Sequence, residues 1–590
     1  MTVDNPSDVN DAVQDAIPTK RLQRIDIGDG LLMRWSTQAD AVNIAGCLAE
    51  VFKWIGDHPK EDEVPPPNEK IRTTVLRLFC GKFPVMTEYD YAVVENTLAK
   101  DGENPIVACI CLQATPGYYG KVQLQYGTAE CVGSHPDYRS RGLIRRLFLE
   151  LIHPASEARG DVIQIIPGIP FFYRQFGYEY AISIVNHQMF EHLATAIPTL
   201  PNGKSEPYLL REPALDDLPY LVQMSTPEQL HNHAGLGTYY TEQYWKYMIH
   251  DLPQIAQSDH ELKRKTRIIV DAQTGQDCGL VMTHVASFLC LNIFTLQDPY
   301  RHQYRDAFFP VLRQMIAVYN EPTIFKEKKR QQGGVKNSKE AQNADAPAAE
   351  VQETEDANHD PSNTTTTAEA DTVIASEFKD KLHSCRILLS PTHPVTQLLQ
   401  PKLTPSRKRY RLYTRIPSYA NFILKVAPAL EDRLARSCLA GISVTWHFDF
   451  FRKVEGSAGR GLEIVFHEGR IVSASDDWVT PTPYETMLAA REKRIAQEKE
   501  ADKQAANTLP SEEVQQQQQQ QLDRVNKAPS LEFKAEFAPL TLTRLLVGDL
   551  TIAEMLDLYG ECSVSGGSDA ELMLDVLFPK QRHYFDVFWW

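Results

Sequence analysis

The alternation of apolar and polar residues predicts a mixed α/β protein. The run 122–132 alternates with a period of about two and predicts a strand, and the apolar runs 31–35, 91–95, 106–112 and 161–168 predict further strands. Residues 40–51 have apolar side chains at helical spacing and predict an amphipathic helix. Together these elements indicate one mixed α/β unit that closes near residue 200.

A second helix is predicted directly after the turn at 134–137. Its apolar residues share one helical face, and they are Leu143, Ile144, Leu147, Phe148 and Leu151. The helix should therefore begin near Tyr138, with Arg139, Arg141 and Gly142 in its first turn. First-turn amides have no partner within a helix and lie at the positive end of its dipole, and a glycine lets the backbone approach a ligand closely. The position suits an anion such as a pyrophosphate, although a solvated basic helix start would carry similar residues.

Two motifs resemble those of the GNAT acetyltransferases. Residues 139–144 (RSRGLI), preceded by Pro136-Asp137-Tyr138, resemble the family's acetyl-CoA motif, written Q/R-x-x-G-x-G/A. Ile144 stands where most members have glycine or alanine, and Ser134 stands where many have valine. Residues 171–178 (FFYRQFGY) resemble the signature F-Y-x-x-x-G-F/Y, in which the tyrosine stands over the cofactor thiol. The resemblance implies a GNAT fold for this unit and acetyl-CoA as the cofactor.

The same resemblance assigns roles to particular residues. The expected cofactor-binding positions lie at the end of the central strand and along the following turn: Val132, Gly133, Ser134, Arg139, Ser140, Arg141, Gly142, Leu143, Ile144 and Arg145. The backbone near Val132 is expected to polarise the thioester carbonyl. Tyr173 matches the general acid that returns a proton to the leaving thiolate, with packing beside Phe172 and Phe176 as the structural alternative.

An internal repeat follows the first unit. The pattern Leu32-Met-Arg34 through Asp40 has an echo in Leu209-Leu-Arg211 through Asp217, and strands are predicted at 267–271, 279–284 and 289–296. We therefore expect residues 1–25 to be a disordered tail, 26–203 a catalytic GNAT domain and 204–412 a degenerate second copy. The equivalent turn at 298–305 has no glycine near its helix start, so this copy is expected to be structural or a wall of the substrate cleft.

The last third of the chain predicts a different unit, at 413–590. Strands are expected at 441–450, 461–466, 468–473 and 531–537, with helices at 540–546 and 552–559. Its closing segment resembles sterol-carrier-protein-like domains. Two segments, 326–373 and 490–530, are rich in polar residues and are expected to be disordered inserts; the second contains seven consecutive glutamines, 515–521.

The order GNAT, degenerate GNAT and carrier-like domain resembles the enhanced intracellular survival (Eis-like) family. Its bacterial members acetylate amines, including aminoglycosides, and form hexamers, so a homo-oligomer is implied. The family also uses the terminal carboxylate of the chain as the base, which here would be that of Trp590. The aromatic end of this chain argues for burial, but a tail without a chemical role is an equal alternative. Glu130 is a competing base, and deprotonation by water is a third option.

The composition of the chain limits the classes of partner and the location that can be expected. A net charge of −16 argues against nucleic acid as the main partner and is compatible with a cationic substrate. Ten cysteines without pairing or metal-ligand spacing predict reduced thiols and a cytoplasmic location, and no metal site is expected. No apolar run is long enough to span a bilayer, and no signal segment is expected.

The sequence therefore predicts an acetyl-CoA-dependent N-acetyltransferase. Its acceptor is an amine, and a small polyamine, an aminoglycoside-like compound and a lysine side chain all remain open. The alternative is a non-catalytic pseudo-acetyltransferase that serves as an interaction or lipid-binding protein. Acetyl-CoA binding without turnover would favour that alternative.

Overall fold

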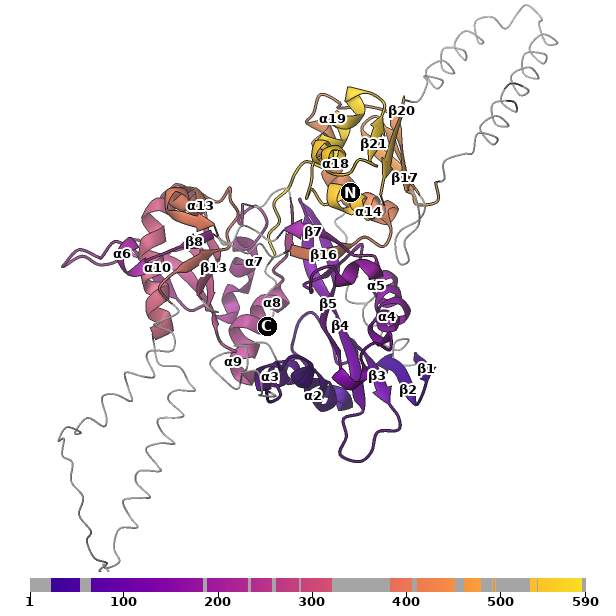
Figure 1. Cartoon of the computed structure of the whole chain (residues 1–590). Coiled ribbons are helices and arrows are strands. Elements are labelled where there is room, and N and C mark those ends of the chain that lie inside the picture. Colours follow the sequence, from indigo (N-terminus) through magenta and orange to yellow (C-terminus); the bar gives the residue numbers. More distant parts are fainter. Residues whose placement is uncertain are drawn as a thin grey trace, which may run out of the picture.

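The computed structural model describes residues 23–53, 65–183, 188–231, 235–256, 261–285, 288–320, 382–405, 411–450, 461–478, 491, 494, 531–538 and 540–585. Most of the predicted tail, nearly all of the two predicted inserts and Trp590 lie outside these ranges. The described residues form three sheets, each covered by helices (Figure 1). Within them, no helix is both long enough and apolar enough to cross a membrane.

The first sheet carries the candidate site. Its strand order is β1-β2-β3-β4-β5-β6-β16-β7, and β10 pairs separately with β4. The strands are β1 (Arg24–Gly28), β2 (Leu31–Trp35), β3 (Tyr91–Asn96), β4 (Ile106–Tyr119), β5 (Val122–Ser134), β6 (Ile163–Ile166), β7 (Glu179–Ser183), β10 (Leu236–Thr238) and β16 (Arg411–Arg415). Neighbouring strands are antiparallel except for β5 and β6, which are parallel. The predicted strands of this unit are confirmed, and β4 is longer than expected.

Helices cover both faces of this sheet. One face packs against α2 (Ala41–Val51) and α3 (Glu69–Leu78), whose apolar side chains form a buried cluster with Tyr91 and Cys109. The other face packs against a continuous helical segment made of α4 (Leu143–Arg146), the π-helix η3 (Leu147–Ile152) and α5 (His153–Ala158). Burial of these two apolar faces is the main stabilising contribution to the unit.

The second sheet repeats the first. Its order is β15-β8-β14-β13-β12-β11-β9. The strands are β8 (Gln188–Phe190), β9 (Tyr208–Arg211), β11 (Arg264–Asp271), β12 (Asp277–Val285), β13 (Leu289–Leu296), β14 (Cys385–Ile387) and β15 (Leu403–Pro405). The helices α7 (Leu218–Met224) and α10 (Tyr304–Asn320) pack on opposite faces.

The repeated sequence pattern forms the same ion pair in both units. Arg34 at the end of β2 donates to Asp40 at 2.7 Å, and Arg211 at the end of β9 donates to Asp217 at 2.7 Å. In each case the aspartate also accepts a backbone N–H from three residues earlier, at 2.8 Å. The echo in the sequence thus corresponds to one structural element, a strand tied to the helix that follows it.

The two units exchange one strand each. β8 follows β7 along the chain but lies between β14 and β15 of the second sheet. β16 follows β15 but lies between β6 and β7 of the first sheet. Sheet membership therefore departs from the boundaries expected at 203 and 412: residues 188–190 belong to the second sheet and residues 411–415 to the first.

The third sheet has the order β19-β18-β17-β20-β21. The strands are β17 (Val444–Phe450), β18 (Gly461–His467), β19 (Arg470–Ser475), β20 (Leu531–Phe537) and β21 (Ser563–Ser565), with α14 (Tyr419–Ala435), α17 (Thr541–Leu546), α18 (Ile552–Leu558) and α19 (Ser568–Leu577). These elements confirm the strands and helices predicted here. The apolar core of this unit continues into the first, where Tyr119, Leu124 and Leu412 join the same buried cluster.

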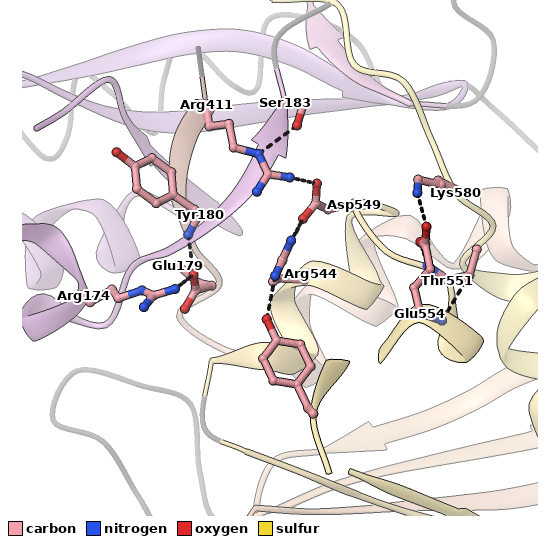
Figure 2. A network of polar contacts seen from close by, with 11 residues as sticks. Arg174, Glu179, Tyr180, Ser183, Arg411, Arg544, Asp549, Thr551, Glu554 and Lys580 are labelled. Carbon is pink, nitrogen blue, oxygen red and sulfur yellow. Dashed lines mark hydrogen bonds and ion pairs between the residues drawn. The ribbon is translucent and has the colours of Figure 1, made fainter. Parts of the chain in front are cut away.

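Polar contacts also join the first and third units (Figure 2). Asp549 accepts hydrogen bonds from Arg411 of β16 and, at 2.6 Å, from Arg544 of α17. Arg544 also donates to the Tyr559 hydroxyl at 2.5 Å. Since Asp549 is buried, both arginines are needed to offset the cost of removing its carboxylate from water.

Candidate active site

The central strand β5 is bulged near its end. β4 and β5 pair from Tyr119 and Val122 to Ala108 and Ser134, but the register shifts between Cys109, which faces Gly133, and Cys111, which faces Glu130. The residue inside the bulge, Cys131, has a φ of 53°, in the left-handed region that non-glycine residues rarely adopt. Such bulges commonly lie beside active sites, where they redirect a backbone group.

The bulge lies beyond the point at which β5 stops pairing with β6. β5 pairs with β6 only from Tyr126 to Thr128. Along 129–134 this edge of β5 has no strand beside it in the part of the chain that the structure describes. The backbone amides near Val132, which the sequence analysis assigned to the thioester carbonyl, therefore lie at an open edge of the sheet.

The turn that follows β5 presents a group of backbone amides. The predicted helix start near Tyr138 is wrong: residues 136–138 form a 3-10 turn, and the helix begins at Leu143 after Gly142. Gly142 has a φ of 73°, and a Cβ at this position would meet no atom within 4 Å. Among the described residues, no acceptor is recorded for the amides of 140–144. This arrangement is the anion-suited helix start that the sequence indicated, moved by one turn.

Three arginines lie on or beside this turn. Arg139 donates to the Ser134 carbonyl at 3.4 Å, and Arg141 donates to the Asp137 carbonyl at 3.3 Å and lies 4.8 Å from the centre of the Tyr138 ring. Arg145 donates to the Gln175 side chain at 2.6 Å. Neither Arg139 nor Arg141 pairs with a carboxylate in the described ranges, whereas the next arginine, Arg146, pairs with Glu150 at 2.6 Å. Positive charge without a carboxylate partner beside unpaired amides suits a phosphate or pyrophosphate.

Tyr173 lies in the connection between the strands β6 and β7. It belongs to the 3-10 helix η4 (Phe172–Phe176), directly after Phe171, whose φ is 64°. Its side chain is buried, with ring centres 5.0 Å from Phe172 and 6.3 Å from Phe176. Tyr173 therefore packs beside Phe172 and Phe176, as the structural alternative to a catalytic role predicted. Packing of this kind also fixes the position of a catalytic phenol, so it does not separate the two roles.

Gly168, at the end of β6, makes room for the Tyr173 ring. A Cβ at Gly168 would lie 2.0 Å from Cε2 of Tyr173, far inside the ordinary contact distance. The backbone and the ring thus touch directly. This requirement was not recognised in the sequence, although the glycine five residues before the tyrosine is a signal that could have suggested it.

Glu130 is the carboxyl group next to the bulge in the sequence. Burial raises the pKa of its carboxyl to about 8, against a smaller opposing effect of the Cys131 backbone N–H. The side chain is half-buried. Burial and the neighbouring Glu130 also raise the pKa of the Cys131 thiol, which makes this thiol a poor nucleophile.

The C-terminal segment is fixed between the units as far as Phe585. The backbone of Tyr584 donates to the Leu236 carbonyl at 2.9 Å and accepts from the Thr238 amide at 2.9 Å, so it extends the pairing of β10. A Cβ at Gly237 would lie 2.6 Å from the Tyr584 carbonyl oxygen, so only glycine admits the segment this closely. The Phe585 ring lies 5.6 Å from that of Tyr126 on β5. The segment therefore leads toward the central strand, while Trp590 itself lies outside the described residues.

Comparison with known proteins supports the fold. No family model matches the sequence, and no curated protein matches it. A GCN5-related N-acetyltransferase from Anabaena variabilis superposes with a TM-score of 0.50 at 12% identity, covering 94% of this chain and 98% of that one. One from Kribbella flavida gives 0.49 at 12% identity (94% and 97% covered), and Eis1 from Mycobacterium abscessus gives 0.44 at 11% (94% and 98%). The superposition with the Anabaena protein shows that the chain shares the fold of that protein, and it confirms the predicted α/β class.

Proposed function

We propose that this chain is an acetyl-CoA-dependent N-acetyltransferase that transfers acetyl directly to an amine. The observation that carries the proposal is the open, bulged end of β5, which leads into the arginine-rich turn. Because β5 and β6 are parallel, the connection that holds Tyr173 leaves β6 at this same end of the sheet. One end of this arrangement suits a pyrophosphate and the other end suits acyl transfer. The name of the Anabaena protein, a GCN5-related N-acetyltransferase, agrees with this chemistry.

The residues at this end of β5 fit acetyl-CoA, which supplies the activated acetyl group when it is bound. The amides of 140–144 with Arg139, Arg141 and Arg145 would hold its phosphates. The backbone N–H near Val132 would stabilise negative charge on the acetyl oxygen, since it lies at the open edge of the sheet. Tyr173 would return a proton to the departing thiolate.

Two groups are proposed as the base that accepts the amine proton. Glu130 has a pKa of about 8, which is close to the working range of a general base at neutral to mildly alkaline pH. The terminal carboxylate of Trp590 is the second. Trp590 lies five positions after Phe585, and an extended chain of five residues spans at most about 17 Å. The distance along β5 from Tyr126 to Glu130 is about 13 Å, so the terminus can reach this level. Water remains the third possibility.

Several finer features belong to the same proposal. The acceptor is a small polyamine, an aminoglycoside-like compound or a lysine side chain, and the protein acts in the cytoplasm, with a hexamer as the proposed assembly. The third unit is proposed to be sterol-carrier-protein-like and to act as a support. Its apolar core runs into the first unit without a break, as a supporting domain requires.

Thiol release from acetyl-CoA, measured against polyamines, aminoglycosides and lysine peptides, tests the proposal. Wild type is compared with Tyr173→Phe, Glu130→Gln and a chain lacking Trp590. We expect turnover with at least one amine and a large loss in Tyr173→Phe. A loss in only one of the other two variants identifies the base. Tight acetyl-CoA binding without turnover on any amine would refute the enzyme and leave the pseudo-acetyltransferase, for which the bulky Ile144 in the cofactor motif is the supporting feature.

A further inference from the structure

A second buried tyrosine, Tyr413, lies against Tyr173. It belongs to β16, the strand that reaches the first sheet from beyond the second unit. In this sheet Tyr413 is opposite Ile166 of β6 on one side and Tyr180 of β7 on the other. Its side chain has no solvent exposure. The sequence analysis placed residue 413 at the start of the third unit and gave it no role.

The ring of Tyr413 occupies the space between two other aromatic rings. Its centre is 5.4 Å from that of Tyr173, with the ring planes at 63°, and 3.8 Å from that of Tyr180, with the planes at 25°. The edge-on contact with Tyr173 is a favoured aromatic geometry, and the stacked contact with Tyr180 holds Tyr413 in turn. Tyr173 is thus enclosed by Gly168 along one side and by the Tyr413 ring along another.

The element that carries Tyr173 cannot fix it alone. η4 is a short 3-10 segment that begins after Phe171, whose backbone is in the left-handed region and whose side chain is 71% exposed. A short 3-10 segment has poorer hydrogen-bond geometry than an α-helix. The orientation of the Tyr173 ring must therefore come from the side chains around it.

We infer that Tyr413 is a positioning residue for Tyr173, and that its ring, more than its hydroxyl, holds the proposed acid in place. The inference rests on the proposed function, because it assigns Tyr413 a role through Tyr173. Burial, with a further contribution from Tyr180, raises the pKa of Tyr413, so its phenol stays neutral and adds no charge beside Tyr173. The Tyr413 hydroxyl forms no well-aligned hydrogen bond in the described structure, although the Tyr180 side chain and the Phe171 backbone lie nearby.

As a consequence, the site of the first unit is completed by a residue that comes after the second unit along the chain. A catalytic group displaced by about 1 Å can lose on the order of a hundredfold in rate. Removing the Tyr413 ring should act in this way. Among the described residues its ring contacts are with Tyr173 and Tyr180, which lie outside the arginine-rich turn, so acetyl-CoA binding should be little affected.

The experiment compares Tyr413→Leu with Tyr413→Phe. We expect Tyr413→Leu to lower kcat on the order of a hundredfold, with the Kd for acetyl-CoA within about twofold of wild type, and Tyr413→Phe to restore kcat to near the wild-type value. The matched control is Leu412→Ala, on the same strand but in the core shared with the third unit. It should lower Tm while leaving kcat unchanged.

Introducing Tyr413→Leu into Tyr173→Phe separates this inference from the proposed function. If Tyr413 acts through Tyr173, the second substitution should add little further loss. An equal loss in both backgrounds would overturn the inference, and so would an unchanged kcat in a folded Tyr413→Leu protein or a loss in Tyr413→Phe as large as that in Tyr413→Leu. A Tyr173→Phe protein with wild-type turnover would instead refute the proposed acid itself.

Discussion

Gly168→Ala is the substitution whose effect the structure defines most closely. The added Cβ would lie 2.0 Å from Cε2, 2.5 Å from Cδ2 and 2.9 Å from Cζ of Tyr173. Carbon atoms in contact are normally about 3.5–4.0 Å apart, so the ring must move by roughly 1.5–2 Å. The Tyr173 ring is packed against Phe148, Phe172 and Tyr413, and it has no room to move without disturbing them.

Two effects should follow, and they differ in size. Overpacking of this kind costs about 1–3 kcal/mol of folding stability. Displacement of the proposed acid should lower kcat on the order of a hundredfold, which is about 2.7 kcal/mol of activation free energy. Acetyl-CoA binding should change less than kcat, because the arginine-rich turn belongs to a different connection and meets η4 through Gln175 and Phe176.

Steady-state thiol release gives kcat, calorimetry gives the Kd for acetyl-CoA, and thermal unfolding gives Tm. Gly560→Ala is the matched control, since a Cβ there would meet no atom within 4 Å. Gly168→Ala should add little to the loss already present in Tyr173→Phe, because the hydroxyl whose position matters is gone. A folded Gly168→Ala protein with wild-type kcat would refute the reasoning, and an undiminished further loss in the Tyr173→Phe background would show that the glycine acts elsewhere.

Three further predictions concern the rest of the site. If ionised Glu130 is the base, its pKa of about 8 predicts that kcat/KM rises roughly tenfold from about pH 7 to about pH 9, and that Glu130→Gln abolishes this rise. The pKa of Glu130 is higher in the folded protein than in the unfolded chain, so the folded protein binds this proton more tightly. The Tm should therefore fall as pH rises from about 4.5 to about 8, and the fall should be smaller in Glu130→Gln. Arg141→Ala should raise the Kd for acetyl-CoA roughly tenfold or more, by loss of a charge-assisted contact, whereas Arg146→Ala, whose partner is a glutamate, should change the Kd little. Gly237→Val should displace the C-terminal segment. If the terminal carboxylate is the base, kcat should fall as far in this variant as in a chain lacking Trp590. Equal kcat in wild type and both variants would exclude that role.

Much of the fold follows from local patterns in the sequence. Apolar periodicity identified the longer strands of all three sheets, because each has a face that must be buried, but it did not identify the short strands β7, β8, β14, β15 and β16. The echo of Arg34 and Asp40 in Arg211 and Asp217 identified the repeat, because the same ion pair closes the same turn in both units. The exchange of β8 and β16 could not be found in this way. Periodicity tells which face of a strand is buried, but it does not tell which strand lies beside it.

The candidate site shows the same division. The arginine-rich turn and Tyr173 were visible because their chemistry depends on residue types at close spacing along the chain. Tyr413 was not, since it is 240 positions away from Tyr173 and meets it only through the strand order. The helix start was predicted too early because Pro136 to Tyr138 form a separate 3-10 turn, after which Gly142 caps the helix from the left-handed region.

The position of β16 has a consequence for how the protein is made on the ribosome. Translation proceeds at about 5–20 residues per second, so roughly 10–50 seconds separate the synthesis of β7 from that of β16. During this interval β6 lacks the partner that will lie beside it, and the nascent chain carries an unsatisfied strand edge next to Tyr173. The N-terminal unit therefore cannot complete its sheet before the second unit and β16 have been synthesised.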